Sequence, residues 1–137
     1  MKNITLINGV EMPCIGLGAK VVWGGEKAKT SELAKNQYEI YAYALETRKC
    51  ELFDTSGSYG LNEEILGNAL HDTGMRKNVL LMTKIGNQAQ REGNVREALE
   101  NSLQKLQTDY IDIYLMHWPQ TGTFIDTYLE MEKIYKE

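Results

Sequence analysis

The sequence contains little cysteine. Its 137 residues include two, Cys14 and Cys50. Two cysteines are too few for a disulfide framework, and their separation does not match the ligand spacing of a metal site. The scarcity therefore favours the reducing cytoplasm as the compartment, and we expect no bound metal.

Long apolar runs and excess positive charge are also missing. No run reaches the roughly 18 to 20 residues that a helix needs to cross a bilayer, and the opening MKNITLINGVEMPCIG lacks the apolar core of a secretory signal. The net charge is −4 and the isoelectric point is near 5.3, which gives no electrostatic reason to bind a phosphate backbone. We expect neither a membrane nor a nucleic acid as a partner.

The composition that remains is that of a globular protein, with 42% hydrophobic and 25% charged residues. No linker or low-complexity segment divides the chain. A single domain over residues 1–137 is therefore expected.

Strand and helix signals alternate along the chain after an N-terminal hairpin. Asn8-Gly9 lies between two short strand-like runs and favours a β-hairpin with a type I′ turn. Four pairs of a strand and a helix follow, with strands in CIGLGA, CELFD, NVLLMTK and YIDIYLMHWP, and helices from Ala34 to Leu45 and in NEEILGNALHDTG, NVREALENSLQKLQ and TFIDTYLEMEKIYKE.

Local signals refine three of these elements. Asn62 is available as an N-cap, with Glu63 and Glu64 in the first turn, and Gly74 suits the C-terminal end of the same helix. The continuous apolar run of NVLLMTK is typical of a strand covered on both faces. The last helix carries apolar residues at helical spacing, namely Phe124, Tyr128, Met131 and Tyr135.

Four alternations predict a parallel sheet of right-handed βαβ units. Two architectures fit this order: an open doubly wound sheet, or part of an eight-stranded (β/α) barrel. GLGAKV lacks the third glycine of the dinucleotide-binding fingerprint, but a lone G-x-G is weak evidence in either direction.

Three polar residues lie at the carboxyl ends of different expected strands. Asp54 ends the second strand, Lys84 the third and His117 the fourth, while Tyr59 follows in the loop after the second. Because the carboxyl ends of parallel strands meet at one rim, these side chains are expected to converge.

Each residue also has a plain structural interpretation. Asp54 could form a turn or cap a helix, and Lys84 could reach solvent as its strand ends. His117 could be a hydrogen-bonded core histidine, and Tyr59 an ordinary packed ring. His71, on the polar side of its helix, is taken as solvated surface.

Together the four residues form a chemically sensible set. An unperturbed tyrosine has a pKa of about 10 and is a poor acid at neutral pH until its anion is stabilised. A nearby lysine ammonium does that, and an aspartate paired with the lysine keeps it charged and in place. A histidine could then hydrogen-bond the same substrate oxygen, so that the set delivers a proton to a carbonyl.

The same segments resemble a known family. GVEMPCIGLG, FDTSGSYG with EEILGNAL, LLMTK and SLQKLQTDYIDIYLMHWP, in this order, are similar to the first half of an aldo-keto reductase. The last segment is the most specific, since it joins a helix ending in Leu-Gln to Asp-Tyr and an apolar strand that closes on His-Trp-Pro. The resemblance covers essentially all 137 residues.

This resemblance implies a truncated (β/α)8 TIM barrel that reduces aldehyde or ketone carbonyls with NADPH. It implies Tyr59 as general acid, Lys84 as the group that strengthens that acid, His117 as the residue that orients the carbonyl, and Asp54 as the partner of the lysine near the nicotinamide ribose. It also implies substrate contacts by Tyr59, His117 and Trp118, although Trp118 could equally be an aromatic plug. Cofactor contacts are expected at Asp54, Gly18, Ala19 and Lys20, and the preference for NADP over NAD rests on the resemblance alone.

The sequence departs from the family pattern in two loops and in length. Leu61 is an extra residue between SYG and NEE, and Ala19 and Lys20 replace the residues that commonly follow GLG. A complete barrel needs roughly 250 residues. Four βα units would leave the first and fourth strands with open edges, so the alternative is a catalytically silent half-barrel that pairs with a second half-barrel chain or with itself.

Overall fold

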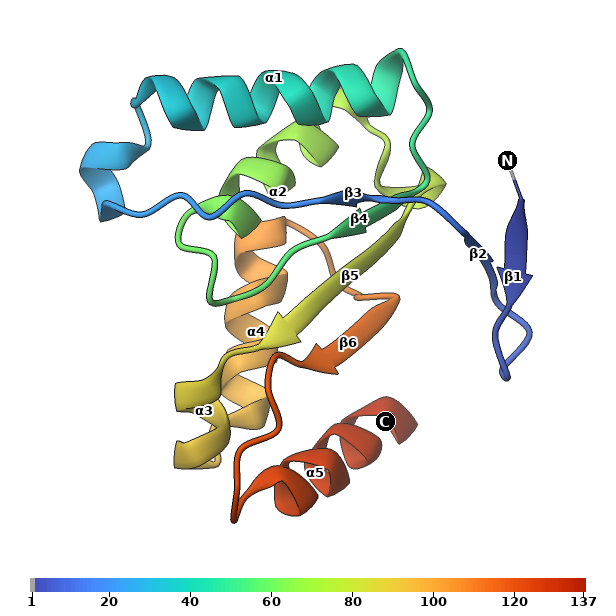
Figure 1. The fold of residues 1–137 in the computed structure, drawn as a ribbon, viewed down its shortest axis with the longest axis vertical. Coiled ribbons are helices and arrows are strands. Elements are labelled where there is room, and N and C mark those ends of the chain that lie inside the picture. Colours follow the sequence, from blue (N-terminus) through green and yellow to red (C-terminus); the bar gives the residue numbers. More distant parts are fainter. Residues whose placement is uncertain (1) are drawn as a thin grey trace.

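The computed structural model describes residues 2–137, which form a small hairpin followed by a parallel sheet with helices on one face (Figure 1). Strands β3 (Leu17–Gly18), β4 (Leu52–Asp54), β5 (Leu80–Ile85) and β6 (Ile113–Met116) lie side by side in chain order, all parallel. The fold is therefore the expected α/β architecture of four βα units, which corresponds to part of a (β/α)8 barrel.

Three helices cover one face of this sheet. They are α1 (Glu32–Glu46), α2 (Asn62–Thr73) and α4 (Val95–Leu106). The short helix α3 (Asn87–Glu92) lies at the carboxyl end of β5, and α5 (Phe124–Lys136) packs against α4. Two 3₁₀ turns, η1 (Gly25–Ala28) and η2 (Arg76–Asn78), complete the elements.

The core lies between the sheet and these helices. Phe53 of β4 is fully buried and meets the ring of Tyr41 of α1 edge to face, with 6.0 Å between the centroids. The buried Tyr41 hydroxyl donates to Asn62 Oδ1 at 2.7 Å, and burial raises the pKa of this tyrosine to about 12. The remaining buried side chains are mostly aliphatic, among them Leu45, Leu66, Leu70, Leu81 and Leu106.

Within residues 2–137, no helix lies over the other face of the sheet (Figure 1). Along β5, Leu81, Thr83 and Ile85 are buried under the helices, whereas the residues between them are only half-buried. The expectation of two covered faces is therefore wrong for the described residues. The apolar run therefore did not distinguish a strand covered on both faces from one covered on a single face.

The hairpin of β1 (Asn3–Thr5) and β2 (Glu11–Pro13) is confirmed, but its turn is not type I′. A type I′ turn needs positive φ at both central residues, and here Gly9 has a φ of 85° while Asn8 does not share it. Leu6 and Val10 close a three-residue loop instead, and the Asn8 side chain accepts from the Val10 N–H at 3.3 Å. The side chain of Asn8 thus stabilises a different loop from the one predicted.

The helix caps follow the sequence in part. Ser31 accepts from the Ala34 N–H at 3.2 Å and caps the start of α1. Gly74 ends α2 in the left-handed conformation with a φ of 66°. The prediction that Asn62 caps α2 is wrong, because Leu61 holds that position and Asn62 is the first helical residue.

The apolar stripe predicted for the last helix is also largely unburied. Phe124, Tyr128 and Tyr135 remain exposed, and Thr127 is the residue of α5 that is buried. The helical spacing was read correctly, but Tyr128 and Tyr135 border an open groove beside α4 instead of a packed interface.

Candidate active site at the carboxyl ends of the strands

The ion pair between Asp54 and Lys84 forms the centre of the site. Asp54 is the last residue of β4, and Lys84 lies on the neighbouring β5, on the face that carries no helices. Lys84 Nζ is 2.5 Å from Asp54 Oδ1 and donates a second hydrogen bond to the Thr55 carbonyl oxygen at 2.8 Å. The ammonium is thereby fixed by two oxygens at the mouth of the sheet.

Tyr59 is brought to this point by the loop after β4. Lys84 Nζ lies 5.3 Å from the centroid of the Tyr59 ring. The backbone of Tyr59 is held on both sides, because its N–H donates to the Ser56 carbonyl at 3.0 Å and its carbonyl accepts from the Val22 N–H at 3.2 Å. The extra residue Leu61 fits this arrangement and donates its N–H to the Val22 carbonyl at 2.9 Å.

Gly60 allows this close approach of the two segments. Its φ is 65°, and a Cβ at this position would lie 2.0 Å from the Val22 carbonyl oxygen. A side chain is excluded by both the left-handed backbone and the contact. Gly60 therefore fixes the loop that presents Tyr59.

His117 follows β6 directly, and its N–H donates to the Ile85 carbonyl at 3.1 Å. Its ring meets the Tyr59 ring edge to face, with 5.3 Å between the centroids and an interplanar angle of 85°. Partial burial, and then the positive charge of Lys84, lower the pKa of His117, while Asp54 opposes that shift. These effects together favour the neutral form of the imidazole.

Trp118 lies at the rim of the same site. Its ring stacks beside that of His117 at a centroid distance of 6.2 Å, and the side chain is 65% exposed. It is therefore not an internal plug in the described residues. The exposed indole widens the apolar surface beside His117.

The residues expected to contact a cofactor lie at the end of β3. Gly18 pairs with Asp54 in the sheet, and a Cβ on Gly18 would meet no atom within 4 Å. Ala19 follows at this edge, and the Lys20 carbonyl accepts from Asn62 Nδ2 at 2.7 Å. The Asp54 side chain is partly exposed at this end of the sheet, and Lys20 is exposed.

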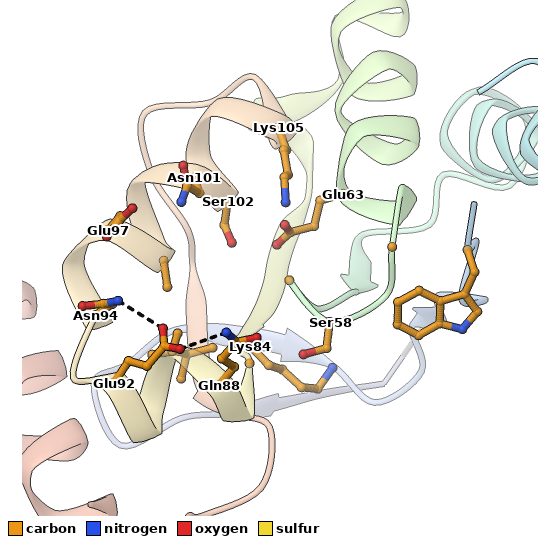
Figure 2. Close-up of a pocket in the computed structure, with 17 residues that line it drawn as sticks. Ser58, Glu63, Lys84, Gln88, Glu92, Asn94, Glu97, Asn101, Ser102 and Lys105 are labelled. Carbon is orange, nitrogen blue, oxygen red and sulfur yellow. Dashed lines mark hydrogen bonds between the residues drawn. The ribbon is translucent and has the colours of Figure 1, made fainter. Parts of the chain in front are cut away.

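A groove of about 470 Å³ lies beside this site, between the loop after β4 and helices α3 and α4. Figure 2 shows Glu63 from α2 and Ser102 and Lys105 from α4 turned toward the same space. Glu63 is buried and accepts from Thr83 Oγ1 at 2.7 Å. The sequence predicted only that Glu63 lies in the first turn of a helix, where most glutamates are solvated. Nothing in the sequence therefore predicted that this side chain is buried.

Sequence reasoning also overlooked Ser56 and Asn62 as parts of the site. Ser56 Oγ lies 3.1 Å from His117 Nδ1. Asn62 accepts from Tyr41 and Thr55 with its side-chain oxygen and so ties the loop to α1. Small polar residues between a strand and a helix are usually interpreted as turn formers. No pattern in a single sequence predicts which distant residues their side chains contact. His71 is exposed, as expected, and lies beside Asp72.

Residues 2–137 contain neither a candidate membrane-spanning helix nor a candidate metal-binding cluster. None of their helices combines the length and apolar character needed to cross a bilayer. No group of three or more histidine, cysteine, aspartate or glutamate side chains among them is arranged to hold a metal ion.

Known proteins are similar to this chain both in sequence and in fold. Glyoxal reductase of Bacillus subtilis is 37% identical over 138 residues, which cover 98% of this chain and 45% of that protein. An aldo/keto reductase from Brucella melitensis superposes with a TM-score of 0.82 at 30% identity, over 98% of this chain and 49% of that one. An aldo/keto reductase from Klebsiella pneumoniae, solved with NADP and acetate, gives a TM-score of 0.78 at 30% identity, over 98% and 46%.

The chain thus spans less than half the length of the curated relatives it matches. The model of the Aldo/keto reductase family matches residues 14–137, which include β3 to β6 and all four residues at the mouth of the sheet. The chain belongs to the aldo/keto reductase family.

Proposed function

We propose that this chain carries the proton-handling part of an NADPH-dependent oxidoreductase that reduces aldehyde or ketone carbonyls to alcohols. The observation that carries the proposal is the convergence of Asp54, Lys84, Tyr59 and His117 at one point, although they come from three strand ends and a loop. Glyoxal reduction by a relative of 37% identity supports a small carbonyl compound as the substrate class.

In the proposed reaction the Tyr59 hydroxyl donates its proton to the carbonyl oxygen. Lys84, held by Asp54, places a positive charge near the tyrosine and stabilises the tyrosinate that remains. The neutral His117 donates a hydrogen bond to the same oxygen and orients the carbonyl. Water then returns a proton to Tyr59.

NADPH, when bound, supplies the hydride that reduces the carbonyl carbon. Asp54, Gly18, Ala19 and Lys20 would hold its nicotinamide ribose end, because they border the open space at the end of β3. The preference for NADP over NAD is supported by the related structure from Klebsiella pneumoniae that contains NADP. A cytoplasmic location fits a cofactor of this kind.

The test is NADPH binding and turnover by the protein. Binding is followed through the fluorescence of Trp23 and Trp118, which are 72% and 65% exposed, and turnover through NADPH oxidation in the presence of glyoxal. The proposal predicts saturable quenching and glyoxal-dependent oxidation. Absence of both contradicts it.

A second candidate function is self-association of a catalytically silent half-barrel. It is supported by the uncovered face of the sheet, where Leu115 of β6 is 40% exposed, and by β3 and β6, each of which has one strand neighbour within the described sheet. The partner would be a second copy of this chain, paired through these edges.

Size-exclusion chromatography over a range of concentrations tests that candidate. Self-association predicts a concentration-dependent dimer that Leu115→Glu shifts to monomer, because the substitution places a charge on the buried contact. The matched control is Leu33→Glu on α1, a site of 37% exposure away from that face. A monomer that binds NADPH contradicts the second candidate.

A further inference from the structure

Ser56 is a buried serine of the site that has no part in the proton transfer described above. Its side chain is fully buried, and its Oγ lies 3.1 Å from Nδ1 of His117. The Ser58 N–H donates to the same Oγ at 3.1 Å, which occupies one of its lone pairs. The single hydroxyl proton of Ser56 can therefore be donated to only one of the remaining hydrogen-bond acceptors.

Two partners compete for this proton. One is Nδ1 of His117 at 3.1 Å, and the other is the Lys84 carbonyl oxygen at 3.4 Å. The carbonyl contact is long for a bond between a hydroxyl and an oxygen, whose usual length is about 2.7–2.8 Å. That carbonyl also accepts from the Gly57 N–H at 3.2 Å, so it is satisfied without Ser56. The geometry favours donation to the histidine.

Donation to Nδ1 has a consequence for the opposite side of the ring. A neutral imidazole has one N–H, and a nitrogen that accepts a hydrogen bond cannot carry it. We propose that Ser56 is a positioning residue whose hydroxyl donates to Nδ1 of His117 and thereby keeps the ring proton on Nε2. This inference rests on the proposed function, since it supplies the donor that His117 needs in order to bind a carbonyl oxygen.

Two other contacts make the arrangement rigid. The His117 N–H is bonded to the Ile85 carbonyl, and the Tyr59 ring packs edge to face against the imidazole. The lowered pKa of His117 favours the neutral ring, which is the form that has two tautomers. Ser56 thus sets which nitrogen faces away from the sheet as a donor.

The test is the tautomer of His117 in ¹⁵N-histidine-labelled protein, read from long-range ¹H–¹⁵N correlations at a pH where the ring is neutral. The chain has two histidines, and His71→Gln assigns the second. The inference predicts a protonated Nε2 and an unprotonated Nδ1 whose resonance lies upfield of a free ring because of the hydrogen bond. A protonated Nδ1 overturns it.

Variants separate the role of the hydroxyl from that of packing. Ser56→Ala should move the Nδ1 resonance downfield and populate the other tautomer, while Ser56→Thr, which keeps the hydroxyl, should restore the native spectrum. Ser102→Ala removes the same atom from another buried serine and should change nothing at His117. An unchanged spectrum in Ser56→Ala contradicts the inference. If that variant does not fold, the wild-type Nδ1 resonance still decides, because only an accepted hydrogen bond moves it upfield of a free ring.

Turnover gives an independent readout. Ser56→Ala should lower kcat for glyoxal roughly tenfold, the order of the contribution of one hydrogen bond, while the dissociation constant for NADPH stays unchanged. The spectrum needs neither cofactor nor turnover. Failure to bind NADPH therefore counts against the proposed function alone, and a protonated Nδ1 counts against the role of Ser56 alone.

Discussion

Asp54 and Lys84 act on His117 with opposite sign, although they form one ion pair. Lys84 lowers the pKa of the imidazole because a second positive charge nearby is unfavourable, and Asp54 raises it. Burial, the largest cause, lowers it further. The charge state of His117 therefore reports on the two residues that are proposed to support Tyr59.

We predict that Lys84→Met raises the pKa of His117 and that Asp54→Asn lowers it. The measurement is an NMR titration of the His117 ring. Lys105→Met is the control, because Lys105 lies in the groove beside the site and is not among the groups that shift this histidine. A Lys84→Met protein with an unchanged His117 pKa would show that the ammonium does not reach this ring.

At the level of single residues, the sequence identified the strand-end side chains and missed their supporting partners. Asp54, Lys84 and His117 were predicted to converge because the ends of parallel strands share one rim, and the structure brings them together with Tyr59. Ser56 was not identified as a functional residue. Its contact with His117 spans 61 positions in the sequence and depends on tertiary packing that no local pattern reports.

Among the elements, the packing of α2 on α4 depends on a glycine within a helix. Gly67 of α2 is buried, and a Cβ there would lie 2.3 Å from the Lys105 carbonyl oxygen and 2.8 Å from Leu106 Cα. Both contacts are with backbone, which cannot rotate away. The two helices can approach this closely only because the side chain is missing.

Gly67→Ala should therefore destabilise the protein by about 1–3 kcal/mol, as expected when an atom is added to a full core. In an open helix the same change would stabilise by about 1 kcal/mol, so the sign of the effect distinguishes the two situations. Urea unfolding measures it, with Asn101→Ala at an exposed position of α4 as the control for helix propensity. A more stable Gly67→Ala protein contradicts the close packing.

The elements themselves were mostly predictable, and the errors have physical causes. Apolar spacing placed α1, α2, α4 and α5, and Gly74 was identified as the residue that ends α2. The short helix α3 was not predicted, because NQAQRE has no apolar stripe to reveal it. The Asn8-Gly9 turn was misassigned because the same dipeptide also suits a three-residue loop with positive φ at glycine alone.

On the scale of the whole molecule, this chain contains all of the residues proposed to handle the proton but only part of the fold of its relatives. The residues proposed to handle the proton are together, while the chain spans less than half the length of its curated relatives. The sequence could not show how much of the inner sheet face would be covered, because an apolar run has the same appearance whether the second layer lies in the same chain or elsewhere.

The most direct test of the central claim is the rate of NADPH-dependent glyoxal reduction by the wild-type protein and by Tyr59→Phe. The claim predicts that loss of the hydroxyl lowers kcat by roughly 100-fold or more, the usual contribution of a general acid. Tyr128→Phe, at an exposed tyrosine of α5, should keep the full rate. A Tyr59→Phe protein that turns over as fast as the wild type would contradict the claim.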